Sequence, residues 1–165
     1  MGKYSIGAKK LRIGDVGAAG IMGTGLTAYK PYKGTVNLTE EDPTNTPHHA
    51  ENARYPDVVV TENGATNFNF EIHDMSAANL AKFVGGEAST DTWTSGTDHF
   101  QIEQSVEIDT IFEETWQIPR MMLTGTITWN ANRTDIARIK VSGMVLQPED
   151  DSTLPLKKIP TPTTP

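Results

Sequence analysis

Residues 58–86 read VVVTENGATNFNFEIHDMSAANLAKFVGG, and this stretch decides the fold because it holds strand, turn and helix signals in succession. Three consecutive valines at 58–60 favour a strand. Asn63-Gly64 is a strong short-range hairpin signal, because both residues tolerate positive φ. The alternating sequence NFNFEI follows at residues 67–72. The stretch therefore predicts a β-hairpin with one hydrophobic face.

A single short helix is predicted directly after this hairpin, over about residues 76–85. Apolar residues at 77, 80, 81 and 84 recur at helical spacing. Asp74 or Ser76 can cap its first turn, and Gly85-Gly86 can provide the left-handed ending. A helix of about 15 Å is marginal in water, so we expect it to pack against the sheet.

Further strands are predicted on both sides of this centre. Residues 26–29 and 35–39 form two strand-like segments divided by a Pro- and Gly-containing turn, and residues 100–112 alternate between apolar and polar side chains. Residues 121–129 and 136–146 form a second hairpin around an Asn-rich turn. With about seven strands and one short flanking helix, the sequence predicts an all-β fold, as a two-sheet antiparallel β-sandwich or a partly closed barrel.

Composition divides the chain into three parts. Residues 1–25 contain seven glycines and predict an extended N-terminal arm. Residues 26–148 hold the β-sandwich domain with a long irregular loop at 40–56, where three prolines and no periodicity suggest a functional segment. Residues 149–165 form a Pro/Thr-rich C-terminal tail whose composition predicts no packed structure.

Charge and residue usage exclude several classes of function. The chain has 165 residues, no cysteine and a net charge of −7, so thiolate chemistry is excluded and tight binding of nucleic acid is disfavoured. No apolar run approaches the length of about 18 residues that a membrane helix needs, so no membrane partner is expected.

The search for chemistry favours a protein without catalytic activity. His48-His49, His73 and His99 lack the spacing of metal ligands, so no metal or other cofactor is predicted. Nucleophile-elbow and phosphate-loop motifs are absent.

Carboxylates at 103, 107 and 109 share one face of a predicted strand. A glycosidase needs two carboxylates facing one cleft, but any solvated acidic strand produces the same pattern, and this second interpretation is favoured. A third interpretation is an aromatic platform for sugars built on Trp93 or Trp129, although aromatic residues on strands more often belong to a core or an interface.

The order of these features resembles the tail tube (major tail) proteins of long-tailed bacteriophages. The resemblance rests on the Gly-rich arm and on four segments. They are TEEDPTNTPHHAE (39–51), VVVTENGATNFNFEI (58–72), SAANLAKFVGG (76–86) and the final strand IKVSGMVLQP (139–148). The Pro/Thr tail has no counterpart in this pattern.

The resemblance implies a structural virion protein that forms rings of six copies, which stack into a hollow tail tube for genome ejection. It implies a tape-measure protein and other tail proteins as partners, DNA that passes through without tight binding, and a location in the virion tail after assembly in the host cytoplasm. The alternatives are a head decoration or tail terminator protein and, from another class, a carbohydrate-binding module.

Two groups of residues are predicted to serve this assembly. Glu103, Glu107 and Asp109 are expected to face the lumen and repel DNA. Contacts between subunits are expected from residues of the arm and of the long loop: Leu11, Ile13, Glu40, Glu41, His48 and Arg54.

Overall fold

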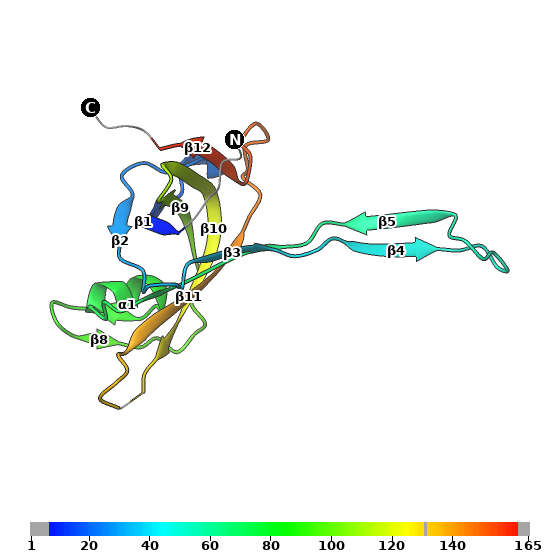
Figure 1. Ribbon diagram of the computed structural model, residues 1–165. Coiled ribbons are helices and arrows are strands. Elements are labelled where there is room, and N and C mark those ends of the chain that lie inside the picture. Colours follow the sequence, from blue (N-terminus) through cyan, green and yellow to red (C-terminus); the bar gives the residue numbers. More distant parts are fainter. Residues whose placement is uncertain (1–6, 131, 162–165) are drawn as a thin grey trace.

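The structure, a computed structural model, describes residues 7–130 and 132–161. Within these residues one antiparallel sheet of eight strands has the order β2-β1-β9-β10-β11-β6-β3, with β12 paired to β10 (Figure 1). Its strands are β1 (Ala8–Asp15), β2 (Thr27–Tyr29), β3 (Asn37–Glu40), β6 (Thr66–Ile72), β9 (Ile102–Thr110), β10 (Glu114–Thr128), β11 (Arg138–Val145) and β12 (Lys157–Pro160). Two small hairpins accompany it, β4 (Thr44–His48) with β5 (Val58–Glu62) and β7 (Glu87–Ala88) with β8 (Trp93–Thr94). The helices are α1 (Ala77–Phe83) and a short 3-10 turn at Ala18–Gly20.

The long strand β10 divides the sheet into two halves. Its first residues, Glu114–Gln117, pair with β12, whereas Met121–Thr128 pair with β11. The register against β9 shifts between Ile118 and Met121, where Pro119 cannot donate a backbone hydrogen bond. A bulge of this kind bends a strand and increases its twist, so the two halves of β10 join different neighbours.

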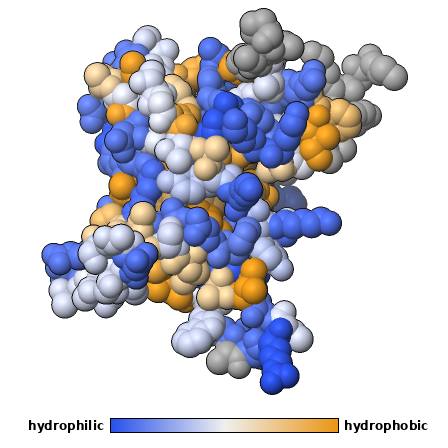
Figure 2. All heavy atoms as spheres, turned by 90° about the vertical axis from the view of Figure 1, so that its left-hand side faces the viewer, coloured by the Kyte–Doolittle hydropathy of each residue, from blue (hydrophilic) through white to orange (hydrophobic). Residues whose placement is uncertain are grey.

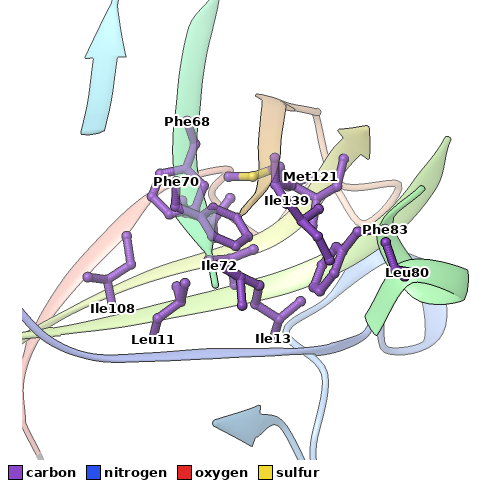
Figure 3. Close-up of a cluster of buried hydrophobic side chains, with 14 residues drawn as sticks. Leu11, Ile13, Phe68, Phe70, Ile72, Leu80, Phe83, Ile108, Met121 and Ile139 are labelled. Atoms are coloured by element: carbon purple, nitrogen blue, oxygen red, sulfur yellow. The ribbon is translucent and has the colours of Figure 1, made fainter. Parts of the chain in front are cut away.

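The hydrophobic core lies inside the folded sheet, beneath α1. Phe83 of the helix is fully buried; its ring centroid lies 5.4 Å from that of Tyr29 on β2 and 6.1 Å from that of Phe70 on β6. Since β2 and β6 lie towards opposite ends of the strand order, the helix spans the gap between them. Figure 3 shows side chains from β1, β6, β9, β10, β11 and α1 gathered in this cluster. The predicted all-β sandwich with one short helix is confirmed, and the sheet is not closed into a barrel.

The helix ends as the sequence predicts. Gly85 and Gly86 have φ values of 87° and 91°, in the left-handed region. The backbone N–H of Gly85 donates to the carbonyl of Leu80 at 3.1 Å. Two glycines therefore terminate α1 and turn the chain towards β7.

The prediction that Asn63-Gly64 forms a hairpin turn is wrong. β5 pairs with β4, whereas β6 pairs with β3 and β11, so Asn63-Gly64 joins two consecutive segments of one long arm of chain. A Cβ atom on Gly64 would lie 2.0 Å from the carbonyl oxygen of Glu41. Glycine is needed here for a close backbone approach, a role that the sequence does not distinguish from a turn.

The Gly-rich N-terminal segment is not an extended arm within its described part. Residues 8–15 form β1, which pairs with both β2 and β9. Leu11 and Ile13 are completely buried in the core, so in this structure their side chains are not available for contacts with another subunit. The loop after β1 is held as well, since Gly23 N–H donates to Ser105 Oγ at 2.9 Å. Residues 1–6 of the predicted arm lie outside the described residues.

The C-terminal tail also contributes to the fold. β12 pairs with β10, and Leu156 packs against the core. The N–H of Thr161 donates to the Glu113 carbonyl at 2.8 Å, and Asp150 N–H donates to the Ala19 carbonyl at 2.9 Å. The prediction of an unpacked tail is therefore wrong for residues 149–161, because backbone pairing compensates for their poor core composition; residues 162–165 lie outside the described part.

Gly125 on β10 sets how closely α1 approaches the sheet. A Cβ atom here would lie 2.6 Å from the carbonyl oxygen of Phe83. We expect Gly125→Ala to lower the free energy of unfolding by about 1–3 kcal/mol, as overpacking does. Gly96→Ala, whose Cβ would have its nearest contact at 3.6 Å, is the control and should change it by no more than about 0.5 kcal/mol. Equal losses in urea unfolding of the two variants would contradict this role of Gly125.

Candidate functional site

An extended hairpin, formed by β4, β5 and the connecting residues 49–57, projects away from the body of the protein (Figure 1). Its five residue pairs run from Thr44 opposite Glu62 to His48 opposite Val58. Thr61 Oγ1 donates to Asn45 Oδ1 at 2.7 Å across the strands, and Asp57 Oδ2 accepts from Ala50 N–H at 2.8 Å near the tip. The segment predicted as an irregular loop at 40–56 therefore forms the first half of an ordered hairpin. Its strand β4 was not predicted from the sequence, because it is polar and contains a proline.

The extended hairpin exposes hydrophobic side chains on both faces. Val58, Val59 and Val60 are 57%, 50% and 45% exposed, and Tyr55 near the tip is 72% exposed. A two-stranded hairpin is marginally stable by itself, and grouped exposed hydrophobic residues mark interaction sites. On the side of the molecule opposite the hairpin, hydrophobic side chains occur in small groups among polar ones (Figure 2). Among the described residues, the hairpin is therefore the strongest candidate for a protein–protein interaction site.

The hairpin region is also strongly acidic. Residues 40–65 contain six carboxylates and one arginine, so they carry a formal charge of −5 out of the chain's −7. The valines were a visible signal of an unusual strand, since they do not alternate with polar residues and Asp57 and Glu62 flank them. Their exposure could not be inferred because the sequence does not show which strand pairs with β5.

The structure places the four contact residues predicted in the long loop along this hairpin region. Glu40 ends β3, and Glu41 accepts a hydrogen bond at 2.8 Å from Asn67 at the root of the hairpin. His48 ends β4, and the Arg54 guanidinium lies 5.6 Å from the ring centroid of Tyr55. All four are exposed. Their contact role stays a prediction.

The three carboxylates predicted to line a lumen do share one face of β9, but arginines hold them. Arg12 on β1 pairs with Glu107 and donates to both oxygens of Asp109 at 2.7 and 2.9 Å. Asp109 is only 7% exposed and also accepts from Thr115 Oγ1 at 2.7 Å. These two side chains therefore form a structural ion cluster rather than a free acidic surface, which composition alone could not show.

Glu103 is the exposed member of the three. Arg120 donates to its two oxygens at 2.8 and 3.1 Å. This hydrogen bonding lowers the pKa of the Glu103 carboxyl, and partial desolvation opposes the shift. The group therefore remains charged at neutral pH with its cation beside it.

The ion cluster around Arg12 yields a stability prediction. Arg12→Met should lower the free energy of unfolding by about 1–3 kcal/mol, because Glu107 and the buried Asp109 lose their cation. Lys10→Met on the same strand is the control, since Lys10 is exposed and has no ion pair among the described residues. Urea unfolding at neutral pH measures both variants; equal stabilities would mean that the cluster contributes nothing.

A second surface feature is the open sheet face, made by side chains of β6, β10 and β11 that point away from the core. Its neutral members are mostly polar, and two are apolar: Asn67, Asn69, Thr124, Thr126 and Ser142, with Met122 and Met144. Lys140 lies opposite Glu71 in the same ladder, and Arg138 pairs with Glu71 at 2.9 Å, so charges of both signs are adjacent. This face is mostly polar and close to neutral. The sequence signal for this face is that every second residue is polar in NFNF (67–70) and in TGTIT (124–128).

Metal binding and an aromatic sugar platform are the two kinds of site that can be checked directly in the described residues. No group of three potential metal ligands occurs among them. Trp93 is partly buried against the core and donates its indole N–H to Gly85 O at 2.8 Å, so it does not form an exposed sugar platform. Trp129 lies just beyond β10 and is 72% exposed, so its ring is accessible from solvent.

Helices long and apolar enough to cross a membrane are not found in the described part of the chain. No protein-family model matches the sequence. No curated protein matches it either.

A solved structure does match the fold. The protein is similar to a chain in the cryo-EM structure of the anti-feeding prophage (AFP) baseplate, 6-fold symmetrised, with a TM-score of 0.53 and 7% sequence identity. The match covers 97% of this chain and 98% of that chain. The two chains thus share a fold over nearly their whole lengths.

Proposed function

We propose that this protein is a structural subunit of a phage-tail-like particle, and that copies of it assemble into six-membered rings that stack into a tail tube. The observation that carries the proposal is the extended hairpin, which projects from the body and exposes its three valines to roughly half of their surface. The shared fold with a chain from a baseplate of sixfold symmetry supports the same class of function. The proposal assigns no catalytic role.

Self-assembly gives the hairpin a partner. Among the described residues, β2 and β3 stand at the two ends of the strand order of the main sheet, and edge strands of this kind can accept strands from neighbours. Burial of apolar surface contributes roughly 25 cal/mol per Å², so docking of the three valines against another copy would stabilise the assembly. Neighbours in a ring or stack supply such surfaces repeatedly, because heterologous contacts either close into rings or extend as filaments.

The open sheet face is the better candidate for a channel wall than the acidic strand. Glu107 and Asp109 are held by Arg12, whereas the amides and hydroxyls of the open face are accessible and nearly neutral. DNA binds tightly where lysines and arginines neutralise several phosphates. A wall with balanced charges would let DNA pass without tight binding, and Glu103, opposite Met122 in the ladder, would lie at its border.

In this function the protein resides in the virion tail after assembly in the host cytoplasm. Its partners are other copies of itself, a tape-measure protein in the channel and other tail proteins at the ends of the tube. Contacts with these partners would use the ends of the sandwich and the open sheet face.

Negative-stain electron microscopy with light scattering at rising concentration tests the proposal. Rings or tubes with a central hole are the expected result. Rings that never lengthen would favour the alternative of a single-ring virion component, such as a tail terminator or a head decoration protein, which the baseplate match also permits. Sugar-dependent quenching of Trp129 fluorescence in a protein that stays monomeric would favour the carbohydrate-binding alternative.

A further inference from the structure

The body of the subunit carries an apolar cavity that is separate from the extended hairpin. A cavity of about 330 Å³ lies between β3 on one side and β1, β9 and β10 on the other. It is lined largely by apolar side chains, among them Ala8, Val36, Leu38, Ile108 and Trp116. Its volume is near the lower end of the range for ligand pockets, about 300–1,000 Å³, and suits a few aliphatic side chains. We refer to it as the β3 groove.

Exposed hydrophobic residues extend the β3 groove at its border. Ile111 and Phe112, in the turn after β9, are 59% and 57% exposed. Ile111 is adjacent to the groove, since a Cβ atom on the lining residue Gly7 would lie 2.8 Å from its Cδ1 atom. The apolar surface around the groove is therefore larger than the cavity itself.

Lysines border the β3 groove. Lys9 follows the lining residue Ala8, is exposed and has no ion pair among the described residues, whereas Lys10 lies opposite Asp109 and so points to the other face of the sheet. The Lys158 ammonium lies 5.8 Å from the ring centroid of the lining residue Trp116, and it also pairs with Glu114 at 3.1 Å. The site therefore combines an apolar floor with a basic border.

The extended hairpin is the complement of this site. Val58, Val60 and Glu62 share one face of β5, because alternate residues of a strand point the same way, whereas the Asp57 carboxylate accepts a hydrogen bond from Ala50 N–H within the hairpin. The hairpin continues from β3, which supplies one wall of the groove, and it projects away from the body (Figure 1), so in this structure it does not fill the groove of its own subunit. A second copy of the chain can present the same hairpin freely.

We propose that the β3 groove of one subunit binds the Val58/Val60 face of the extended hairpin of a second copy, with Lys9 facing Glu62 of the hairpin. This inference rests on the proposed self-assembly and names the surface that receives the hairpin. The contact is heterologous, since a groove on one copy meets a hairpin on the next, so it propagates through successive subunits.

Cross-linking tests the contact directly, because the natural chain contains no cysteine. Protein carrying Ala8→Cys is mixed with protein carrying Val58→Cys at a concentration where the wild type associates, and a short bis-maleimide is added. The expected product is a dimer with one copy of each variant, identified by mass spectrometry of the linked peptides. Thr90→Cys, in the exposed turn between β7 and β8, replaces Ala8→Cys in the control and should give at least tenfold less product.

A charge exchange tests the specificity of the contact. Lys9→Glu reverses the charge at the groove border, and Glu62→Lys reverses it on the docking face of the hairpin. Each variant alone should fail to associate in light scattering, because its groove and hairpin then repel each other. A mixture of the two should associate again, since the hairpin of each variant then fits the groove of the other.

The outcomes separate this inference from the proposed function. Association with no Ala8–Val58 product above the control would overturn the groove assignment and leave self-assembly standing. A specific product from particles that form no ring would support the groove contact and overturn the ring. Absence of both association and product at every concentration would overturn both.

Discussion

Replacement of residues 44–62 by a short Gly-Ser linker is expected to abolish association of the protein with itself without unfolding it. No residue of β4 or β5 belongs to the hydrophobic core, and all ten are exposed. The free energy of unfolding should therefore change by no more than about 0.5 kcal/mol, as for surface changes in general. Light scattering measures the association, and urea unfolding measures the stability.

A matched control separates loss of the hairpin from loss of any exposed loop. The turn at residues 89–91 between β7 and β8 is also exposed, and its replacement by Gly-Ser sequence of the same length should leave association intact. Normal assembly of the hairpin deletion would remove the hairpin from the function. Unfolding of that deletion would instead show that the hairpin stabilises the subunit itself.

Leu11→Ala is expected to lower the free energy of unfolding by about 2–5 kcal/mol, the range for removing a large aliphatic side chain from a core. Leu11 is completely buried on β1, between β2 and β9. Leu154→Ala, at a side chain that is 67% exposed, should change it by no more than about 0.5 kcal/mol. Urea unfolding compares the two.

This comparison decides whether β1 is a core strand or an arm that awaits a neighbour. Because small domains have total stabilities of about 5–15 kcal/mol, the expected loss would be a large share of the total. A change below about 0.6 kcal/mol, together with impaired association, would instead restore the interpretation of Leu11 as a contact between subunits.

Local signals predicted those parts of the fold that local sequence controls. Alternation at Phe68, Phe70 and Ile72 predicts a strand with one buried face, and all three side chains are buried. Helical spacing with Gly85-Gly86 at its end predicts α1 to within two residues at either boundary. These features depend on neighbours within one or two turns of chain.

Long-range pairing accounts for the parts that the sequence did not reveal. Leu11 and Ile13 alternate over too few residues to stand out among glycines, and their partners on β9 lie more than ninety positions away. Residues 157–160 form a strand only because β10 offers its edge. The sequence predicts pairing of β5 with β6 because the Asn63-Gly64 turn signal lies between them. The actual partner of β5 is β4, which precedes it and is connected to it by residues 49–57.

The candidate site shows the same division. The shared face of Glu103, Glu107 and Asp109 follows from strand periodicity, but the cation that holds Glu107 and Asp109 comes from β1 and was not predictable. The segment at 40–56 was predicted as an irregular functional loop, but part of it is β4, and its order depends on the pairing of β4 with β5; its functional role stays a prediction. The β3 groove combines residues from three distant parts of the sequence, at positions 7–8, 36–38 and 108–116.

A cryo-EM map of particles assembled from the wild-type protein tests the central claim most directly. The expected map shows a ring or tube in which the hairpin of each subunit lies in the β3 groove of another and the open sheet face borders the central channel. A particle with the hairpins free in solvent, or a protein that stays monomeric at every concentration, would contradict it.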